Sequence, residues 1–414
     1  RSFLRLSLLS KRRQDPKELH WRRLYPANPM RCLASAMLLS LGSQRLTVAA
    51  FARANNRLIA MRIAKRALTA FEYRAPSAPP QTTRFQSTLS IQDMTELTEQ
   101  TTEYPLEMTE DERYLFDLNG YVIIRGVLTP EEVKEANDVI DRRQSLMIER
   151  SEAALRNAVK GTAFYGSGPG RKDLGGVLEW GEESKVFKSI LAHPRLRPLF
   201  NGILGKGYRM DHLPFVIAQD KGGEGFQLHG GTVDCTSGEY NPYLAYTCHQ
   251  GQIRSSLLGV NVMLTDHNAG DGGFCVVPGS HKSNFKMPDG MVDGEKYQEF
   301  IRQPTTKAGD IVLFSEGTVH GAMAWTSDQQ RRVCLYRFSP STNVYGRSYF
   351  GNEGGGWPKA MYEDLTDAQR AVLEPPYANR LDRPIIQEDG SVEISSRNAR
   401  KKQHDQELFG TKYF

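Results

Sequence analysis

The distal half of the chain alternates short apolar runs with turn residues. Five such runs follow residue 208, at 215–218, 257–264, 273–277, 310–314 and 332–338. Runs of this length, separated by Gly, Pro, Asn and Asp, are typical of buried strands rather than helices. Many short strands at regular spacing favour a sandwich or jelly roll. The pattern therefore predicts a mainly β domain.

Helices are expected to flank these strands. Residues 121–128 predict a buried strand, and Thr129, Pro130 and Glu132 follow as an N-cap, a first helical position and the reciprocal position of a capping box. Apolar residues at helical spacing extend this helix to about residue 155. Further helical patterns cover 185–205 and 365–373. The expected fold is thus mainly β with flanking helices.

Residues 1–87 differ in composition from the rest. They hold 17 of the 53 Lys and Arg residues but only three of the 48 acidic ones. An acid-poor segment rich in Arg, Ala and Ser is typical of an organelle transit peptide, and we expect mitochondrial import. The alternatives are another organelle, with the apolar run 33–41 as a secretory or plastid signal, and a conceptual translation that includes untranslated sequence.

The remaining chain divides into a polar linker at 88–110, a β domain with N-terminal helices at 111–375, and a C-terminal extension at 376–414. Without the leader, 36 basic and 45 acidic residues remain, which argues against nucleic-acid binding. No apolar run is long enough to span a bilayer. The five cysteines form no C-x-x-C pair, which argues against a thiolate zinc site. We expect a small-molecule substrate, and the sequence does not predict the oligomeric state.

Three residues form a candidate metal and cosubstrate site. His229 follows a predicted strand, His320 follows the strand at 311–314, and Arg331 begins the next strand. Two neutral imidazoles and a carboxylate hold iron(II) on one side and leave open positions for a 2-oxo acid and O2. An arginine fork suits the distal carboxylate of such an acid better than lysine. The order of these residues favours an iron oxygenase.

The sequence resembles the phytanoyl-CoA dioxygenase family over residues 111–375. The resemblance rests on the segment 119–133, on Gly272-Gly-Phe-Cys-Val-Val-Pro-Gly-Ser-His-Lys, on Ala308-Gly-Asp-Ile-Val-Leu-Phe, and on His320-Gly with Arg331. It implies a double-stranded β-helix (a cupin-like jelly roll), iron(II), 2-oxoglutarate and O2. It also implies that His229 and His320 are iron ligands and that Arg331 binds 2-oxoglutarate, with Arg332 as the alternative if the strand register differs by one.

One position departs from the family. The family has His-x-Asp at the first ligand, whereas position 231 here is glycine. Three interpretations follow. Asp234 completes the iron site through the flexible Gly230-Gly231 pair, which makes the chain a hydroxylase releasing succinate and CO2. Alternatively, chloride occupies the empty position, as in related halogenases with His-x-Gly. In the third, the protein is a catalytically silent β-helix that binds a ligand.

Overall fold

The computed structural model describes residues 96–97, 104–152, 155–346, 349, 356–377, 383–394 and 399–410. The predicted leader at 1–87 lies outside the described residues, as does most of the predicted linker at 88–110. The mitochondrial targeting of this chain therefore stays a prediction. The described residues belong to one compact unit, Ser87–Phe414.

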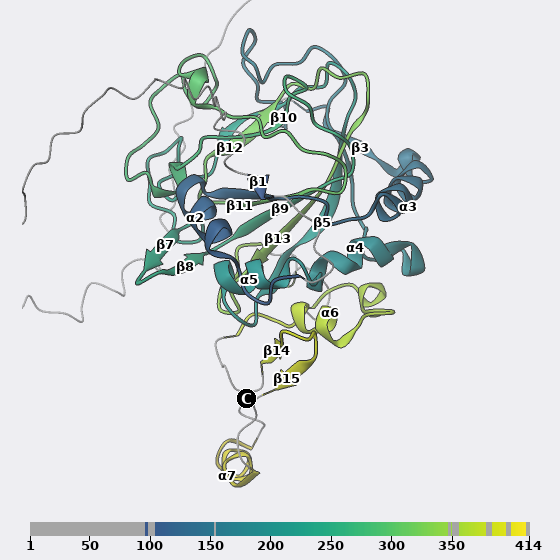
Figure 1. The fold of residues 1–414 in the computed structure, drawn as a ribbon, viewed down its shortest axis with the longest axis vertical. Helices are drawn as coiled ribbons and strands as arrows, with labels where there is room; N and C mark the ends of the chain where they lie inside the picture. The colour runs from purple at the N-terminus through teal and green to yellow at the C-terminus, as the bar shows by residue number, and fades with distance from the viewer. Residues whose placement is uncertain are drawn as a thin grey trace, which may run out of the picture. The chain divides into compact units, whose positions relative to one another are not determined.

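Two β-sheets form the centre of this unit (Figure 1). The large sheet contains, in spatial order, β1 (Glu96–Leu97), β2 (Tyr121–Ile124), β11 (Ile311–Ser315), β9 (Leu258–Met263), β13 (Arg331–Ser339), β5 (Arg209–Gln219), β4 (Lys172–Leu174) and β3 (Ile148–Glu149). The small sheet contains β10 (Gly273–Val276), β12 (His320–Met323) and β6 (Phe226–His229). Two hairpins pair β7 (Tyr246–His249) with β8 (Gln252–Ser255), and β14 (Pro384–Ile386) with β15 (Val392–Ile394).

Strand β13 shows how the layers are built. Val333 and Leu335 belong to the apolar core shared with Phe274 of the small sheet. The alternate residues Cys334 and Tyr336 belong to the core on the other face of the large sheet. Because successive side chains of a strand point to opposite faces, one strand supplies both cores. The two sheets therefore enclose an apolar interior, while the second core lies under the helices.

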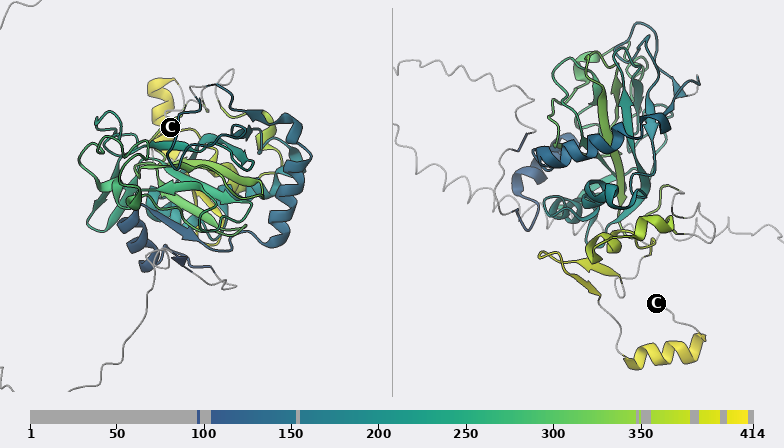
Figure 2. Two further views of the ribbon diagram at one scale, coloured as in Figure 1. Left: turned by 90° about the horizontal axis from the view of Figure 1, so that it is seen from above. Right: turned by 90° about the vertical axis from the view of Figure 1, so that its right-hand side faces the viewer.

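Helices cover the outer face of the large sheet, on the side away from β10 and β12 (Figures 1 and 2). The helices that contribute buried residues to the core on this face are α2 (Glu110–Asn119), α3 (Pro130–Asp141), α4 (Lys185–Ser189), α5 (Arg197–Leu204) and α6 (Asp367–Val372). A further helix, α7 (Ala399–Phe409), belongs to the C-terminal extension. The predicted capping box of α3 is confirmed: Glu132 donates its backbone N–H to the Thr129 hydroxyl at 3.2 Å, and the Glu132 carboxylate accepts from Thr129 N.

Two predicted helices are shorter than expected. The helix from Pro130 ends at Asp141 rather than near residue 155. Arg143 and Gln144 stand where the apolar stripe would continue, and the Arg143 guanidinium instead binds the Glu183 carboxylate. The helix predicted at 185–205 is divided into α4 and α5. Pro194 lies in the gap, where it lacks an N–H and disfavours helical geometry at the preceding residue.

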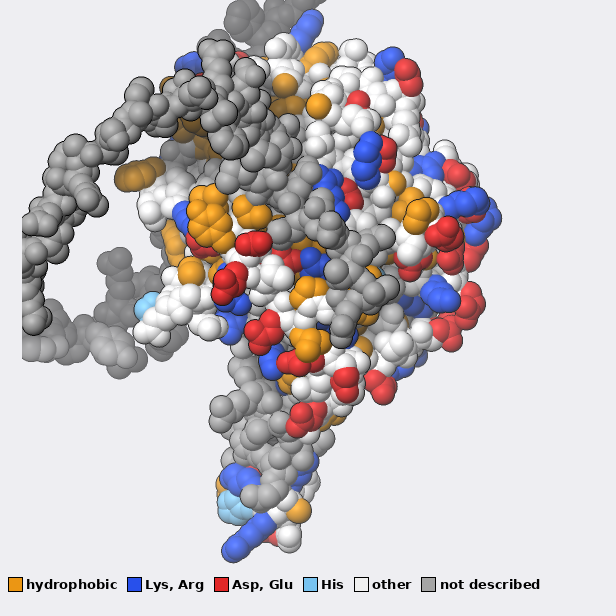
Figure 3. Space-filling view, in the orientation of Figure 1, with side chains coloured by type: hydrophobic (Ala, Val, Ile, Leu, Met, Phe, Trp, Pro, Cys, Tyr) orange, Lys and Arg blue, Asp and Glu red, His pale blue; other side chains and the backbone are white. Residues whose placement is uncertain are grey.

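The arrangement is a double-stranded β-helix, which confirms the predicted fold class. Among the described residues no helix is long and apolar enough to cross a membrane. Acidic and basic side chains are interspersed over the face seen in Figure 3.

Buried histidines make the stability of this fold depend on pH. Burial lowers the pKa of His193 and of His281 from the ordinary 6.5 to about 4. Between these two pKa values the unfolded chain binds more protons than the folded chain. The contribution of each histidine to the free energy of unfolding is therefore complete above pH 6.5 and decreases as the pH falls. At about pH 5 we expect a loss of roughly 1–2 kcal/mol per histidine in urea denaturation.

The variant His281→Gln should show a smaller difference in unfolding free energy between about pH 7.5 and about pH 5 than the wild type. His249 is exposed, so His249→Gln is the matched control and should keep the wild-type difference. An identical pH dependence in all three proteins would contradict this assignment.

Candidate iron and 2-oxoglutarate site

The small sheet brings the two predicted histidine ligands together. His229 ends β6, His320 begins β12, and the two are directly opposite each other in the antiparallel pairing of these strands. Their ring centroids are 4.3 Å apart. Two residues separated by 91 positions in the sequence therefore bring their imidazoles side by side.

Backbone carbonyls fix the orientation of both rings. Nδ1 of His229 lies 3.1 Å from the carbonyl oxygen of Gln227, and Nδ1 of His320 lies 2.8 Å from that of Thr318. A carbonyl only accepts, so each Nδ1 donates a proton and each Nε2 keeps a lone pair. This is the second-sphere arrangement that orients metal-binding histidines.

The environment keeps both imidazoles neutral. Burial, followed by the charge of His320, lowers the pKa of His229 to about 3, and burial also lowers that of His320. Aromatic rings surround the pair: Phe226 lies 5.1 Å from His229 and Phe314 lies 4.8 Å from His320, measured between centroids. Neutral imidazoles in a water-poor site can bind a metal ion without first losing a proton.

A carboxylate that the sequence reasoning missed lies beside this pair. Glu316 follows β11 and is 5% exposed. Its Oε2 atom lies 3.6 Å from Nε2 of His320, and its Oε1 atom accepts a hydrogen bond from Nε of Arg337 at 2.5 Å. Burial alone would raise the pKa of Glu316, but the charge of Arg337, assisted by His320, lowers it to about 2. The sequence did contain one indication of this residue, namely a charged side chain directly after a buried apolar strand.

Asp234, the carboxylate predicted to complete the site, is used in a turn. Its Oδ1 atom accepts hydrogen bonds from the backbone N–H groups of Thr236 at 3.0 Å and Ser237 at 2.7 Å. Within the described part of the chain, no group of three His, Cys, Asp or Glu side chains is spaced as a metal site. The structure thus brings His229 and His320 together without placing Asp234 between them.

The two candidate arginines occupy opposite faces of β13. Arg332 points away from the sheet interior and pairs with Asp141, with 2.6 Å between Nη2 and Oδ1. Arg331 points inward, is 3% exposed, and donates from Nη1 to the side-chain oxygen of Gln219. Burial, followed by the charge of Arg171, lowers the pKa of Arg331 to about 9, so it remains charged at neutral pH. Of the two candidates, Arg331 is therefore the one whose charge faces the interior.

The surroundings of Arg331 leave polar atoms without partners. Among the described residues, Nε of Arg331 and Nε2 of His267 are buried with no hydrogen-bond partner. Both residues flank Gly273, where an added Cβ would lie 2.8 Å from Nε of Arg331 and 3.3 Å from Nδ1 of His267. Buried polar groups are normally satisfied, so these two neighbouring unpartnered atoms are groups that an anionic ligand would satisfy.

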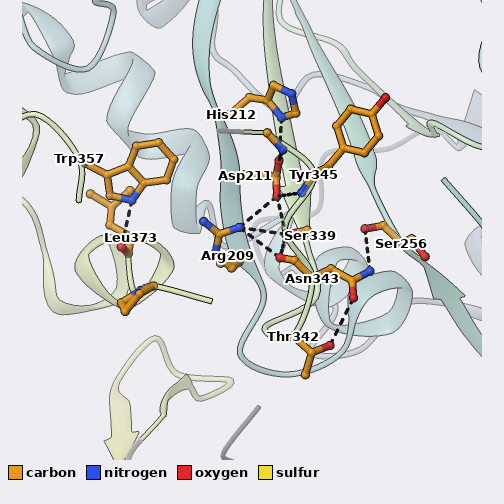
Figure 4. Close-up of polar contacts among 12 residues, drawn as sticks. Arg209, Asp211, His212, Ser256, Ser339, Thr342, Asn343, Tyr345, Trp357 and Leu373 are labelled. Carbon is orange, nitrogen blue, oxygen red and sulfur yellow. Dashed lines mark hydrogen bonds and ion pairs between the residues drawn. The ribbon is translucent and has the colours of Figure 1, made fainter. Parts of the chain in front are cut away.

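A buried polar network fixes the far end of β13. Asp211 of β5 binds Nη1 of Arg209 at 3.0 Å and the hydroxyl of Ser339 at 3.2 Å (Figure 4). It also accepts from the backbone N–H of Tyr345 at 3.0 Å. The network joins β5, β13 and the following loop just beyond Arg337, the residue that holds Glu316.

Comparison with known proteins defines the class. The family model for phytanoyl-CoA dioxygenase matches residues 116–333, and the chain belongs to this family. It is thus a 2-oxoglutarate-dependent dioxygenase, a class that uses iron(II), 2-oxoglutarate and O2. The ectoine dioxygenase of Streptomyces coelicolor is 22% identical over 227 residues, 50% of this chain and 69% of that protein. That of Bordetella parapertussis is 20% identical over 267 residues, 59% and 79% of the two chains.

Solved structures with a similar fold include HygX from Streptomyces hygroscopicus with nickel and 2-oxoglutarate bound. Its TM-score is 0.46 at 20% identity, and the match covers 57% of this chain and 88% of HygX. The epimerase SnoN from nogalamycin biosynthesis, which is α-ketoglutarate dependent, has a TM-score of 0.40 at 18% identity, covering 62% and 95% of the two chains.

The donor set of this chain fits the metal of its family. Two adjacent imidazoles keep their Nε2 atoms for a metal because both Nδ1 atoms are held by carbonyls, and the Glu316 carboxylate lies beside His320. Nitrogen and carboxylate donors of this kind suit iron(II) with open positions.

Restoring the family's His-x-Asp sequence should not restore a ligand at position 231. Gly231 has a φ of +107°, and an added Cβ would lie 2.4 Å from the carbonyl oxygen of Val233. We expect Gly231→Asp to lower the free energy of unfolding by about 1–3 kcal/mol without raising metal affinity. Gly251→Asp is the control, because Gly251 has a φ of +76° with nothing within 4 Å of its Cβ position.

The comparison is made by urea denaturation and by calorimetric titration with Mn(II). A Gly231→Asp protein that is as stable as Gly251→Asp and binds Mn(II) more tightly than wild type would show that the loop accepts a carboxylate at position 231.

Proposed function

We propose that this protein hydroxylates a small organic molecule, with iron(II) held by His229 and His320 and 2-oxoglutarate anchored by Arg331. The observation that carries the proposal is the pairing of His229 with His320 across β6 and β12, with each Nδ1 atom held by a backbone carbonyl so that Nε2 is left to bind a metal. The inward-facing Arg331, which has no acidic partner among its described contacts, supports it.

The bound metal would supply the oxidation of an unactivated C–H bond. In the balanced reaction one oxygen atom of O2 enters the substrate as a hydroxyl group and the other enters succinate, while 2-oxoglutarate loses CO2. The protein's residues bind and orient. Arg331 offers a fixed guanidinium to the distal carboxylate of the cosubstrate. His267 offers a buried Nε2 atom nearby, and Phe226 and Phe314 exclude water around the histidines.

Oxygenation of a substrate should produce succinate and a product that is one oxygen atom heavier. The purified chain is incubated with iron(II), 2-oxoglutarate, O2 and a panel of small molecules in chloride buffer, and the products are measured by mass spectrometry. His320→Ala should abolish succinate formation, because it removes one of two histidine ligands. A chlorinated product would establish halogenation instead, and an iron-loaded wild type that makes no succinate with any substrate would favour the silent binding protein.

The anchoring role of Arg331 has its own test. Arg331→Lys should weaken 2-oxoglutarate binding about tenfold or more, because lysine cannot form the two parallel hydrogen bonds of a guanidinium. Calorimetric titration of the Mn(II)-loaded protein measures the affinity. Arg332→Lys is the matched control: its pair with Asp141 lies on the other face, so 2-oxoglutarate affinity should stay at the wild-type value. Equal losses in both variants would exclude a specific anchor.

A further inference from the structure

The carboxylate missing from position 231 has a candidate substitute on a different strand. We infer that Glu316 is the carboxylate ligand of the metal site, in place of a side chain two residues after His229. This inference rests on the proposed function, because it concerns the same metal ion. It assigns the third ligand to the residue four positions before the second histidine, rather than to the segment that follows the first.

Two facing atoms, Nε2 of His320 and Oε2 of Glu316, are placed to share a cation. Nδ1 of His320 donates to the carbonyl oxygen of Thr318, so Nε2 carries a lone pair. The Oε2 atom of Glu316, which is also only an acceptor when ionised, lies 3.6 Å from that Nε2 atom. Two acceptors at this separation repel unless a positive charge lies between them. A metal ion between them would be bound by both atoms, and it suits the Nε2 lone pair that remains while Nδ1 donates to Thr318.

The observed separation is close to that of two ligands on one ion. Nitrogen and oxygen ligands about 2.1 Å from a metal lie roughly 3 Å apart when they occupy neighbouring positions. The distance of 3.6 Å exceeds this by a few tenths of an ångström. A small rotation of the Glu316 side chain therefore converts the pair into neighbouring ligands.

Arg337 supports the same role. It holds the Oε1 atom of Glu316 at 2.5 Å and leaves Oε2 directed at His320. Metal-binding carboxylates are commonly held in this way, with one oxygen on the metal and the other in a hydrogen bond to the protein. The buried network around Asp211 fixes the strand end beyond Arg337 and so limits the movement of this support.

The Gly230-Gly231 pair makes room for Glu316. The carbonyl oxygen of Glu316 accepts from the backbone N–H of Gly231 at 3.5 Å, and a Cβ at Gly230 would lie only 2.8 Å from that oxygen. A side chain at Gly230 would therefore displace the backbone at Glu316. The glycine at 230 thus permits the close approach of the Glu316 backbone, and a carboxylate at 316 in place of one at 231 leaves the charge of the ligand set unchanged.

The test compares Mn(II) affinity, by calorimetric titration and by the Mn(II)-induced rise in melting temperature. Glu316→Gln should weaken Mn(II) binding by at least about tenfold, because it replaces an anionic ligand with a neutral amide. Asp234→Asn is the matched control and should bind as wild type, since its carboxylate caps a turn. Wild-type affinity in Glu316→Gln, or a loss confined to Asp234→Asn, would overturn the inference.

Arg337→Gln separates metal binding from the ion pair. If Glu316 serves only to neutralise Arg337, the double variant Glu316→Gln/Arg337→Gln, which has neither charge, should bind Mn(II) as the wild type does, and that result would overturn the inference. As a ligand, Glu316 should still bind Mn(II) in Arg337→Gln. Should Glu316→Gln fail to fold, the double variant Glu316→Gln/Arg337→Gln removes both charges and is compared with Arg337→Gln alone. The inference predicts a further loss of at least about tenfold, and no further loss contradicts it.

The wild type distinguishes this inference from the proposed function. A wild-type protein that binds neither Mn(II) nor iron(II) refutes the proposed function itself. A wild type that binds the metal, with Glu316→Gln binding equally well, refutes only the role of Glu316.

Discussion

The chemistry of this protein depends on the antiparallel register of β6 and β12. The pairing sets His229 directly opposite His320, and a shift of one residue would turn one imidazole to the other face of the sheet. The register is held by the surrounding fold, because β12 also pairs with β10, whose Phe274 and Val276 lie in the core between the sheets. The strand pairing that buries this core therefore also places the two histidines opposite each other.

The same alternation organises strand β13. Arg331 and Arg337 are six positions apart and point to the interior, whereas Arg332 points to the helical side and pairs with Asp141. Burying a guanidinium in the interior of a β-helix costs free energy because the charge loses its hydration. Each inward-pointing arginine is therefore expected to have an anionic partner. Arg337 has Glu316. Arg331 has only an amide oxygen from Gln219 among its described hydrogen bonds, and this difference gives the two arginines different roles.

The sequence predicted much of the fold because strands and helix starts depend on local patterns. The apolar runs after residue 208 became strands of the two sheets, and the capping box at Thr129 formed as expected. Helix ends were predicted less well, because the end of α3 at Asp141 depends on a contact between Arg143 and the distant Glu183. His229 and His320 could be chosen because each lies next to a predicted strand, and because Arg331 follows at the start of the next strand.

The rest of the site required three-dimensional information. The choice between Arg331 and Arg332 depends on which face of β13 meets the small sheet, and the sequence left this open. Asp234 was attractive because it lies near His229 in the sequence, but nearby backbone N–H groups bind its carboxylate. Glu316 could not be connected to His229 from the sequence, since the contact depends on β11 ending beside the Gly230-Gly231 turn.

In the proposed site, two imidazoles from β6 and β12 share one metal ion while Arg331 binds the cosubstrate. A crystal structure of the wild type with Mn(II) and 2-oxoglutarate, grown without O2 and measured at the manganese absorption edge, tests this most directly. The account predicts one anomalous peak bonded to Nε2 of His229 and Nε2 of His320, with the distal carboxylate of 2-oxoglutarate on Arg331. A manganese ion bound elsewhere, or 2-oxoglutarate bound away from Arg331, would contradict it.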